Sequence, residues 1–136
     1  MEQINRRSAL ACGLVGVYGL VLSEQAVAQT PTAGKELAPG VRQVDLGERD
    51  SLIPAYGKVR LRDIVLQPGA KTTENAMMND MLCHLTEGEL EVVQNAKKFT
   101  VKKGDVWTCA KGITTEGTQN NGSTIAIMRI IDLLPA

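Results

Sequence analysis

From Val41 to the C-terminus, the sequence consists of short apolar or alternating segments separated by Gly, Pro and Asn. Residues 57–62, for example, alternate between charged and apolar side chains, and the turn residues Pro68-Gly69 follow soon after. A period of two is typical of β-strands, and no stretch after residue 40 keeps the 3.6-residue period of an amphipathic helix. Short strands spaced about eight to twelve residues apart predict an all-β sandwich or barrel over residues 41–136.

The strands are expected in seven segments: residues 57–62, 64–66, 82–86, 90–93, 99–101, 105–109 and 125–131. A closed barrel would remove the exposed strand edges that such a sequence leaves unprotected. Only Tyr56, Phe99 and Trp107 are aromatic after residue 28, so Val, Ile, Leu and Met must form the core. A core of this size buries only a modest area, so we expect a homodimer formed through one sheet.

The first 28 residues have the pattern of an export signal. Arg6 and Arg7 precede an apolar run over residues 9–22, and the small-residue site Ala26-Val27-Ala28 follows. This pattern predicts a signal peptide, residues 1–28, cut after Ala28. The apolar run is shorter than the roughly 20 residues of a membrane-spanning helix, so no stable membrane anchor is expected after cleavage.

Two further expectations concern export. Residues 5–10 resemble a twin-arginine signal, with the general secretory route as the alternative. Residues 29–40 are rich in Pro, Thr, Ala and Gly and predict a flexible lead-in before the folded domain. The sequence therefore predicts a periplasmic or secreted bacterial protein.

The charges of the chain balance. It has 15 Lys and Arg residues and 15 Asp and Glu residues, and residues 1–28 contain two of each sign. A net charge of zero argues against a nucleic-acid partner or an anionic membrane surface. Lys97, Lys98, Lys102 and Lys103 do cluster, but the apolar residues between them indicate a hairpin with a solvated face.

Three glycine-containing motifs resemble those of the small cupins. They are Leu66-Gln67-Pro68-Gly69-Ala70, Leu85-Thr86-Glu87-Gly88-Glu89-Leu90 and Lys103-Gly104-Asp105-Val106-Trp107. The resemblance covers residues 57–134 and implies a jelly-roll β-barrel of six to eight strands, often dimeric. Cupins usually hold a divalent metal ion at the barrel mouth through two histidines, a glutamate and a third histidine.

The resemblance preserves the spacing of these motifs but not the metal ligands. The positions of the first two histidines fall on Asn75 and Met77, that of the glutamate on Met81, and that of the last histidine on Thr115. A shift of one residue would instead bring Glu74 or Glu116 inward. His84 is the only histidine of the chain, and strand alternation places it on the face opposite Met81.

Sulfur-containing side chains occupy the two segments that normally form the site. Alternation places Met81, Cys83 and Leu85 on one face, and the resemblance places the strand of Cys109 beside that of Cys83. Three interpretations remain open. The residues form a plain apolar pocket, Cys83 and Cys109 form a disulfide, or both cysteines bind copper together with Met77 and Met81.

The sequence favours a binding protein over an enzyme. Ser51 and Ser123 lack a second histidine or a clear base, so we expect no catalytic residues and no cofactor. The leading hypothesis is a metal-free cupin-like barrel that binds a small molecule or serves as a structural module. Its binding residues would be Asn75, Met77, Met81, Cys83, Cys109 and Thr115. The alternatives are a copper-binding protein and a metal-dependent oxygenase or isomerase of the cupin kind.

Overall fold

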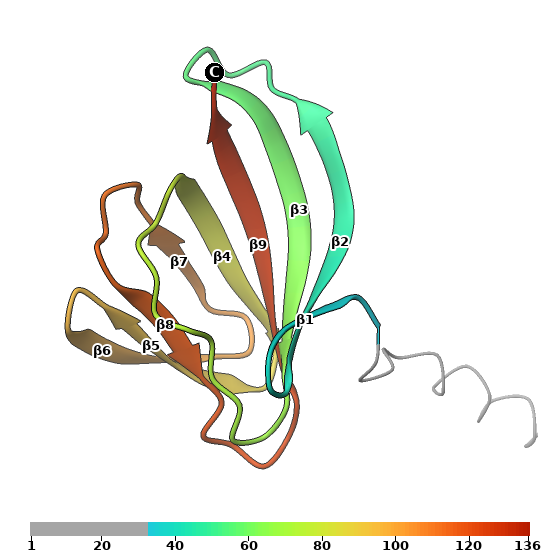
Figure 1. The fold of residues 1–136 in the computed structure, drawn as a ribbon, viewed down its shortest axis with the longest axis vertical. Helices are drawn as coiled ribbons and strands as arrows, with labels where there is room; N and C mark the ends of the chain where they lie inside the picture. Colours follow the sequence, from blue (N-terminus) through green and yellow to red (C-terminus); the bar gives the residue numbers. More distant parts are fainter. Residues whose placement is uncertain (1–32) are drawn as a thin grey trace, which may run out of the picture. The chain divides into compact units, whose positions relative to one another are not determined.

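The computed structural model describes residues 33–136, which form nine strands and no helix in that range. The predicted signal peptide, residues 1–28, lies outside the described residues, as do residues 29–32 of the predicted lead-in. Within the described part of the chain there is no helix that could span a membrane. The strands form two antiparallel sheets (Figure 1).

Six strands form the larger sheet, in the order β1-β2-β3-β9-β4-β7. Their bounds are Lys35–Ala38 (β1), Val41–Asp50 (β2), Tyr56–Leu66 (β3), Ala126–Pro135 (β9), Asp80–Glu87 (β4) and Val106–Cys109 (β7). The apolar C-terminal strand β9 lies in the interior of this sheet and pairs with β3 on one side and β4 on the other. Strands far apart in the sequence are therefore neighbours, as a jelly roll requires.

The smaller sheet has the order β6-β5-β8. Its strands are Lys97–Lys102 (β6), Glu89–Gln94 (β5) and Glu116–Gln119 (β8). The segment between β3 and β4 runs along the free edge of β8 and forms the isolated bridges Lys71↔Gln119 and Asn75↔Glu116. This segment therefore acts as an irregular fourth strand beside β8 (Figure 1).

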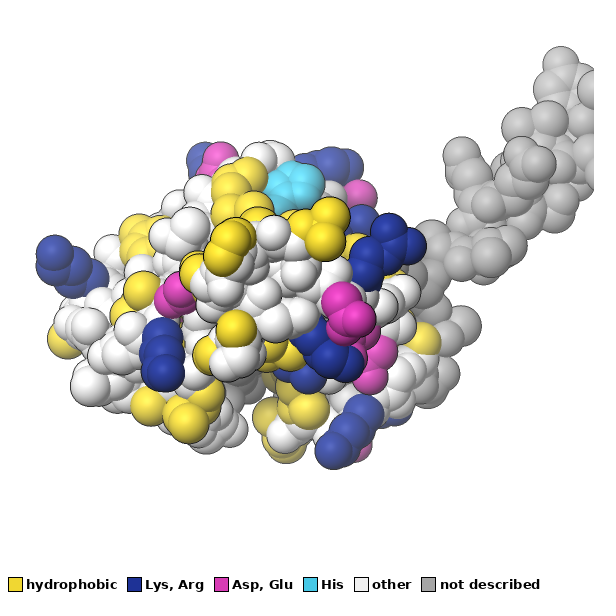
Figure 2. Space-filling view, turned by 90° about the horizontal axis from the view of Figure 1, so that it is seen from above, with side chains coloured by type: hydrophobic (Ala, Val, Ile, Leu, Met, Phe, Trp, Pro, Cys, Tyr) yellow, Lys and Arg dark blue, Asp and Glu magenta, His cyan; other side chains and the backbone are white. Residues whose placement is uncertain are grey.

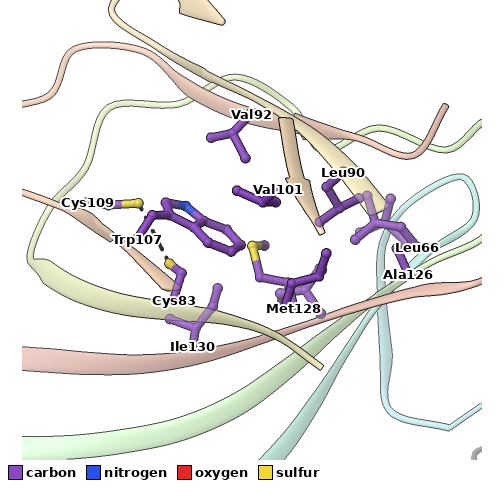
Figure 3. Close-up of a cluster of buried hydrophobic side chains, with 13 residues drawn as sticks. Leu66, Cys83, Leu90, Val92, Val101, Trp107, Cys109, Ala126, Met128 and Ile130 are labelled. Carbon is purple, nitrogen blue, oxygen red and sulfur yellow. Dashed lines mark hydrogen bonds between the residues drawn. The ribbon is translucent and has the colours of Figure 1, made fainter. Parts of the chain in front are cut away.

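The inner faces of the two sheets meet in one apolar core. Thirteen buried side chains form it: Val41, Ile64, Leu66, Cys83, Leu85, Leu90, Val92, Val101, Trp107, Cys109, Ala126, Met128 and Ile130. Figure 3 shows ten of them labelled, with Trp107 lying beside the two cysteines. As the composition predicts, nearly all of this core is aliphatic or sulfur-containing.

Two turns show how the sequence fixes the strand ends. Asn95 and Ala96 join β5 to β6 with φ values of 47° and 68°, which suits a tight hairpin between right-twisted strands. Gly88 separates β4 from β5 at a φ of 79°, and a Cβ there would lie 2.7 Å from the carbonyl oxygen of Ile125. Only glycine fits both constraints at position 88.

The structure confirms the predicted fold class, an all-β jelly-roll barrel. One prediction is wrong in part: Lys35–Ala38, placed in the flexible lead-in, form β1 and pair with β2. Strand β2 was not among the predicted segments, because Val41–Asp50 carries no regular alternation. Strand β8 was not predicted either, because Glu116-Gly117-Thr118-Gln119 contains no apolar residue to mark a period of two. The homodimer stays a prediction.

Candidate functional site

A cavity of about 210 Å³ is lined by residues of both sheets. Its larger-sheet wall consists of Leu37 (β1), Arg62 and Ile64 (β3), Met81 and Cys83 (β4), Cys109 (β7), and Met128 and Ile130 (β9). The opposite wall consists of Thr72, Thr73, Asn75, Met77, Glu116, Gly117 and Thr118. A mostly apolar and sulfur-containing wall, with Arg62 as its charged member, therefore faces a mostly polar wall that includes three threonines and the carboxyl group of Glu116.

Five of the six side chains predicted to form the site line this cavity: Asn75, Met77, Met81, Cys83 and Cys109. The exception is Thr115, which is exposed and does not line the cavity, so its predicted position is wrong. Glu116 lies there instead, because the bridges Asn75↔Glu116 and Gln94↔Glu116 fix the register of β8. The one-residue shift considered for Glu116 is thus observed, while ligand binding by these residues stays a prediction.

The two cysteines lie side by side on the inner face of the larger sheet. Strands β4 and β7 pair so that Met81 is opposite Cys109 and Cys83 is opposite Trp107. The two Sγ atoms are 3.8 Å apart, and both thiols are buried and free (Figure 3). A disulfide would bring the Sγ atoms to about 2.05 Å. His84, on the opposite face of β4, is exposed, as strand alternation predicts (Figure 2).

The environment of Cys109 does not make it a nucleophile. Its hydrogen bond with Cys83, burial and the neighbouring Glu116 together raise the pKa of the Cys109 thiol far above its ordinary value. Reactive cysteines are thiolates with lowered pKa values in electropositive, accessible surroundings. Thiol-based covalent catalysis therefore finds no support in this arrangement.

Glu116 is the buried carboxyl group of the cavity, with 9% of its surface exposed. Its Oε1 accepts a hydrogen bond from Cys109 Sγ at 3.2 Å, while its Oε2 has no partner within the described residues. Burial raises the pKa of Glu116, and hydrogen bonds from Cys109 and Gln94 offset this only in part. A buried polar atom without a partner is uncommon in folded proteins and marks a place where a ligand can bond.

We expect Glu116→Gln to stabilise the protein more as the pH rises. The folded state binds the Glu116 proton more tightly than the unfolded state, whose glutamate pKa is about 4.3. The wild type therefore loses stability as the pH rises from that value through the raised folded pKa, whereas the glutamine variant does not. Urea unfolding at pH 4 and pH 8 measures the difference.

The control variant is Glu36→Gln at an exposed position of β1, which corrects for the loss of one negative charge. Wild type and Glu116→Gln could instead differ in their free energy of unfolding by the same amount at both pH values. That result would mean that the carboxyl group of Glu116 is not desolvated as described.

A charged cluster that the sequence analysis missed supports one end of the cavity. Arg62 lines the cavity and donates two hydrogen bonds to the fully buried Asp132, at 2.7 and 3.0 Å. Arg60 donates to the same carboxylate at 2.9 Å, and Asn79 donates at 3.3 Å. The remaining Arg62 nitrogen, Nη1, donates to Gln43 at 2.9 Å. Arg62 is thereby held in place and is not free to pair with Glu116.

The donors at the cupin metal positions do not fit a hard or borderline divalent ion. Asn75, Met77 and Met81 offer an amide and two thioethers where imidazoles and a carboxylate would be needed. Within residues 33–136, no three His, Cys, Asp or Glu side chains converge as a ligand group for a metal ion.

Comparisons with known proteins agree on the fold. No family model matches the chain. A search of curated proteins found no match either. Among solved structures, KdgF from Halomonas sp. has a TM-score of 0.59 at 15% identity over 73% of this chain and 84% of its own. The Cupin_2 domain of an XRE family transcriptional regulator from Enterobacter cloacae has a TM-score of 0.60 at 16% identity, over 71% and 99% of the two chains.

A third similar structure is a sugar phosphate isomerase of the cupin superfamily from Silicibacter pomeroyi, with a TM-score of 0.56 at 21% identity over 70% of this chain and 60% of its own. These proteins and the present chain share the cupin barrel. At such identities the similarity establishes the fold alone.

Proposed function

We propose that this protein binds a small, mostly apolar molecule in the cavity between its sheets, with one polar group of the ligand bonded to Glu116. The observation that carries the proposal is a preformed, mostly apolar cavity that contains a buried carboxyl oxygen without a partner among residues 33–136. Ligand sites are typically apolar hollows with a few polar groups that orient the ligand. An apolar cavity of about 150 Å³ in another protein binds benzene, so about 210 Å³ suits one ring with a short substituent.

Two features of the chain support binding rather than catalysis. The buried Cys109 thiol is protonated rather than activated, and Arg62 is fully engaged with Asp132 and Gln43. A metal-dependent oxygenase or isomerase has less support, because Asn75, Met77 and Met81 replace the usual ligands. The export-signal pattern of residues 1–28 supports a periplasmic or secreted location for this activity.

The methionines provide a direct test by NMR. Met77, Met81 and Met128 line the cavity, whereas Met78 is 75% exposed and does not. With methyl-13C methionine incorporated, toluene and benzyl alcohol are titrated into the full chain. We expect saturable shifts of the Met77, Met81 and Met128 signals, little change at Met78, and tighter binding of benzyl alcohol because its hydroxyl meets Glu116.

The matched variant is Glu116→Leu, which keeps a side chain of similar size and removes the carboxyl group. It should abolish the preference for benzyl alcohol while toluene still binds. The proposal would be contradicted if neither probe gave a saturable shift, or if Met78 shifted as much as the three cavity methionines.

A further inference from the structure

We propose that Cys83, Cys109 and the thioether of Met81 form a binding site for a soft monovalent metal ion, Cu(I). The first observation is the spacing of the thiols, whose Sγ atoms are 3.8 Å apart. Two thiolates that share one ion at about 2.3 Å, with tetrahedral to trigonal angles, lie about 3.8–4.0 Å apart. The two thiols are therefore spaced for a shared ion without movement of β4 or β7.

The second observation is the supply of soft donors around the thiols. Met81 is the register partner of Cys109, so their side chains are neighbours on the inner face of the sheet. Met77 lines the same cavity from the opposite wall. Thiolate and thioether sulfur together favour Cu(I), whereas harder divalent ions prefer imidazole and carboxylate.

Binding of the ion balances in bonds and protons. Binding of Cu(I) to both cysteines breaks two S–H bonds, forms two Cu–S bonds and releases two protons, with no change of oxidation state. Both protons leave to solvent. The hydrogen bond from Cys109 Sγ to Glu116 Oε1, at 3.2 Å, is lost with the Cys109 proton.

Nearby charges balance the resulting complex. A Cu(I) ion with two thiolates carries one negative charge. The cluster of Arg60, Arg62 and Asp132 carries one positive charge, and Arg62 Nη2 lies 3.9 Å from Met81 Sδ. A buried charge needs such compensation.

The test uses the reduced full chain with Cys12→Ser, so that Cys83 and Cys109 are its only thiols. Under anaerobic conditions, Cu(I) is offered as its coloured bicinchoninate complex, and transfer to the protein is followed by loss of that colour. We expect one Cu(I) per chain, affinity that rises with pH because protons are displaced, and much weaker binding of Zn(II).

Variants distinguish Cu(I) binding at this site from non-specific Cu(I) binding to other sulfur atoms of the chain. Cys83→Ser and Met81→Leu should each weaken Cu(I) binding, the first by more than about 100-fold, since loss of even an outer residue costs about 10–100-fold. Met78→Leu, at an exposed methionine outside the cavity, should leave the affinity unchanged. Circular dichroism checks that each variant is folded, and Met81→Leu keeps the test decisive if Cys83→Ser unfolds.

Several results would overturn the site: no transfer of copper, binding that tolerates both variants, or tighter binding of Zn(II). A Cys83–Cys109 disulfide in protein taken directly from its natural compartment would also overturn it, because a disulfide removes both thiolates. Cu(I) binding is a separate activity from the proposed binding of a small apolar molecule. The toluene titration tests the cavity whether or not copper binds, so the two proposals can fail independently.

Discussion

Replacing Asp132 with alanine is expected to lower the free energy of unfolding by about 3–5 kcal/mol, the cost of removing one partner from a buried ion pair. Asp132 is fully buried on β9, and its carboxylate accepts hydrogen bonds from Arg60, Arg62 and Asn79. The Arg62 side chain is only 14% exposed, so the variant leaves its guanidinium without its main partner and poorly hydrated. Urea unfolding at pH 7 measures the loss.

The matched control is Glu48→Ala, which removes an ion pair with Lys58 that is about half exposed on both sides. That change should cost at most about 1 kcal/mol. An equal loss in the two variants would contradict the role assigned to the buried cluster.

The pH dependence of the free energy of unfolding provides an independent test of the role of Asp132. Burial alone would raise the pKa of this carboxyl group, but the interactions with Arg62, Arg60 and Asn79 outweigh burial, and the pKa lies below its ordinary value. The stability that Asp132 contributes is therefore present above the unfolded pKa of about 3.9 and is lost as the pH falls through the lowered folded pKa. The difference between wild type and Asp132→Ala should shrink over that acidic range.

Leu85→Ala is the second variant with a large expected effect, a loss of about 2–5 kcal/mol. Leu85 lies on β4 on the same face as Cys83, is 0% exposed and belongs to the core shared by both sheets. Truncation would remove apolar contacts and leave a new cavity, because the paired strands on either side restrict collapse. Thermal and urea unfolding both report this loss.

Leu52→Ala is its control, because Leu52 is fully exposed in the loop between β2 and β3. That substitution should change stability by no more than about 0.5 kcal/mol. A loss below about 1 kcal/mol for Leu85→Ala would contradict the packing of the inner face of β4, and with it the inward placement of Met81 and Cys83.

Local sequence patterns predicted most of the strands. Neighbouring residues alone are enough to predict three features: strand β3 from its alternation, strand β9 from its apolar run, and the turn at Gly88. Strands β1, β2 and β8 were missed because their own residues do not mark them as strands, and each is defined by its pairing: β1 with β2, β2 with β3, and β8 with β5. Lys35–Ala38 and Glu116–Gln119 carry no period of two of their own.

The same physical reason explains the error at the site. The spacing of the cupin-like motifs places Thr115 inward, but the register of β8 is set by its pairing with β5 and with Asn75. A slip of one residue turns every side chain of a strand to the other face. Glu116 and Thr118 therefore line the cavity, and Thr115 is exposed.

The charged cluster was missed although the sequence contains a signal for it. Arg60 and Arg62 lie two residues apart on β3, so they share a face, and Asp132 is an isolated acidic residue in an otherwise apolar stretch of β9. A lone charge within a buried strand needs a partner. What local patterns could not show is that β3 and β9 are neighbours in the sheet.

A crystal structure of the protein under xenon pressure tests most directly whether the cavity between the sheets exists. Xenon binds in apolar cavities, so we predict a xenon atom inside the barrel in contact with Met81, Met128 and Ile130, which line the cavity. A barrel without xenon, with those side chains filling the space between the sheets, would contradict it.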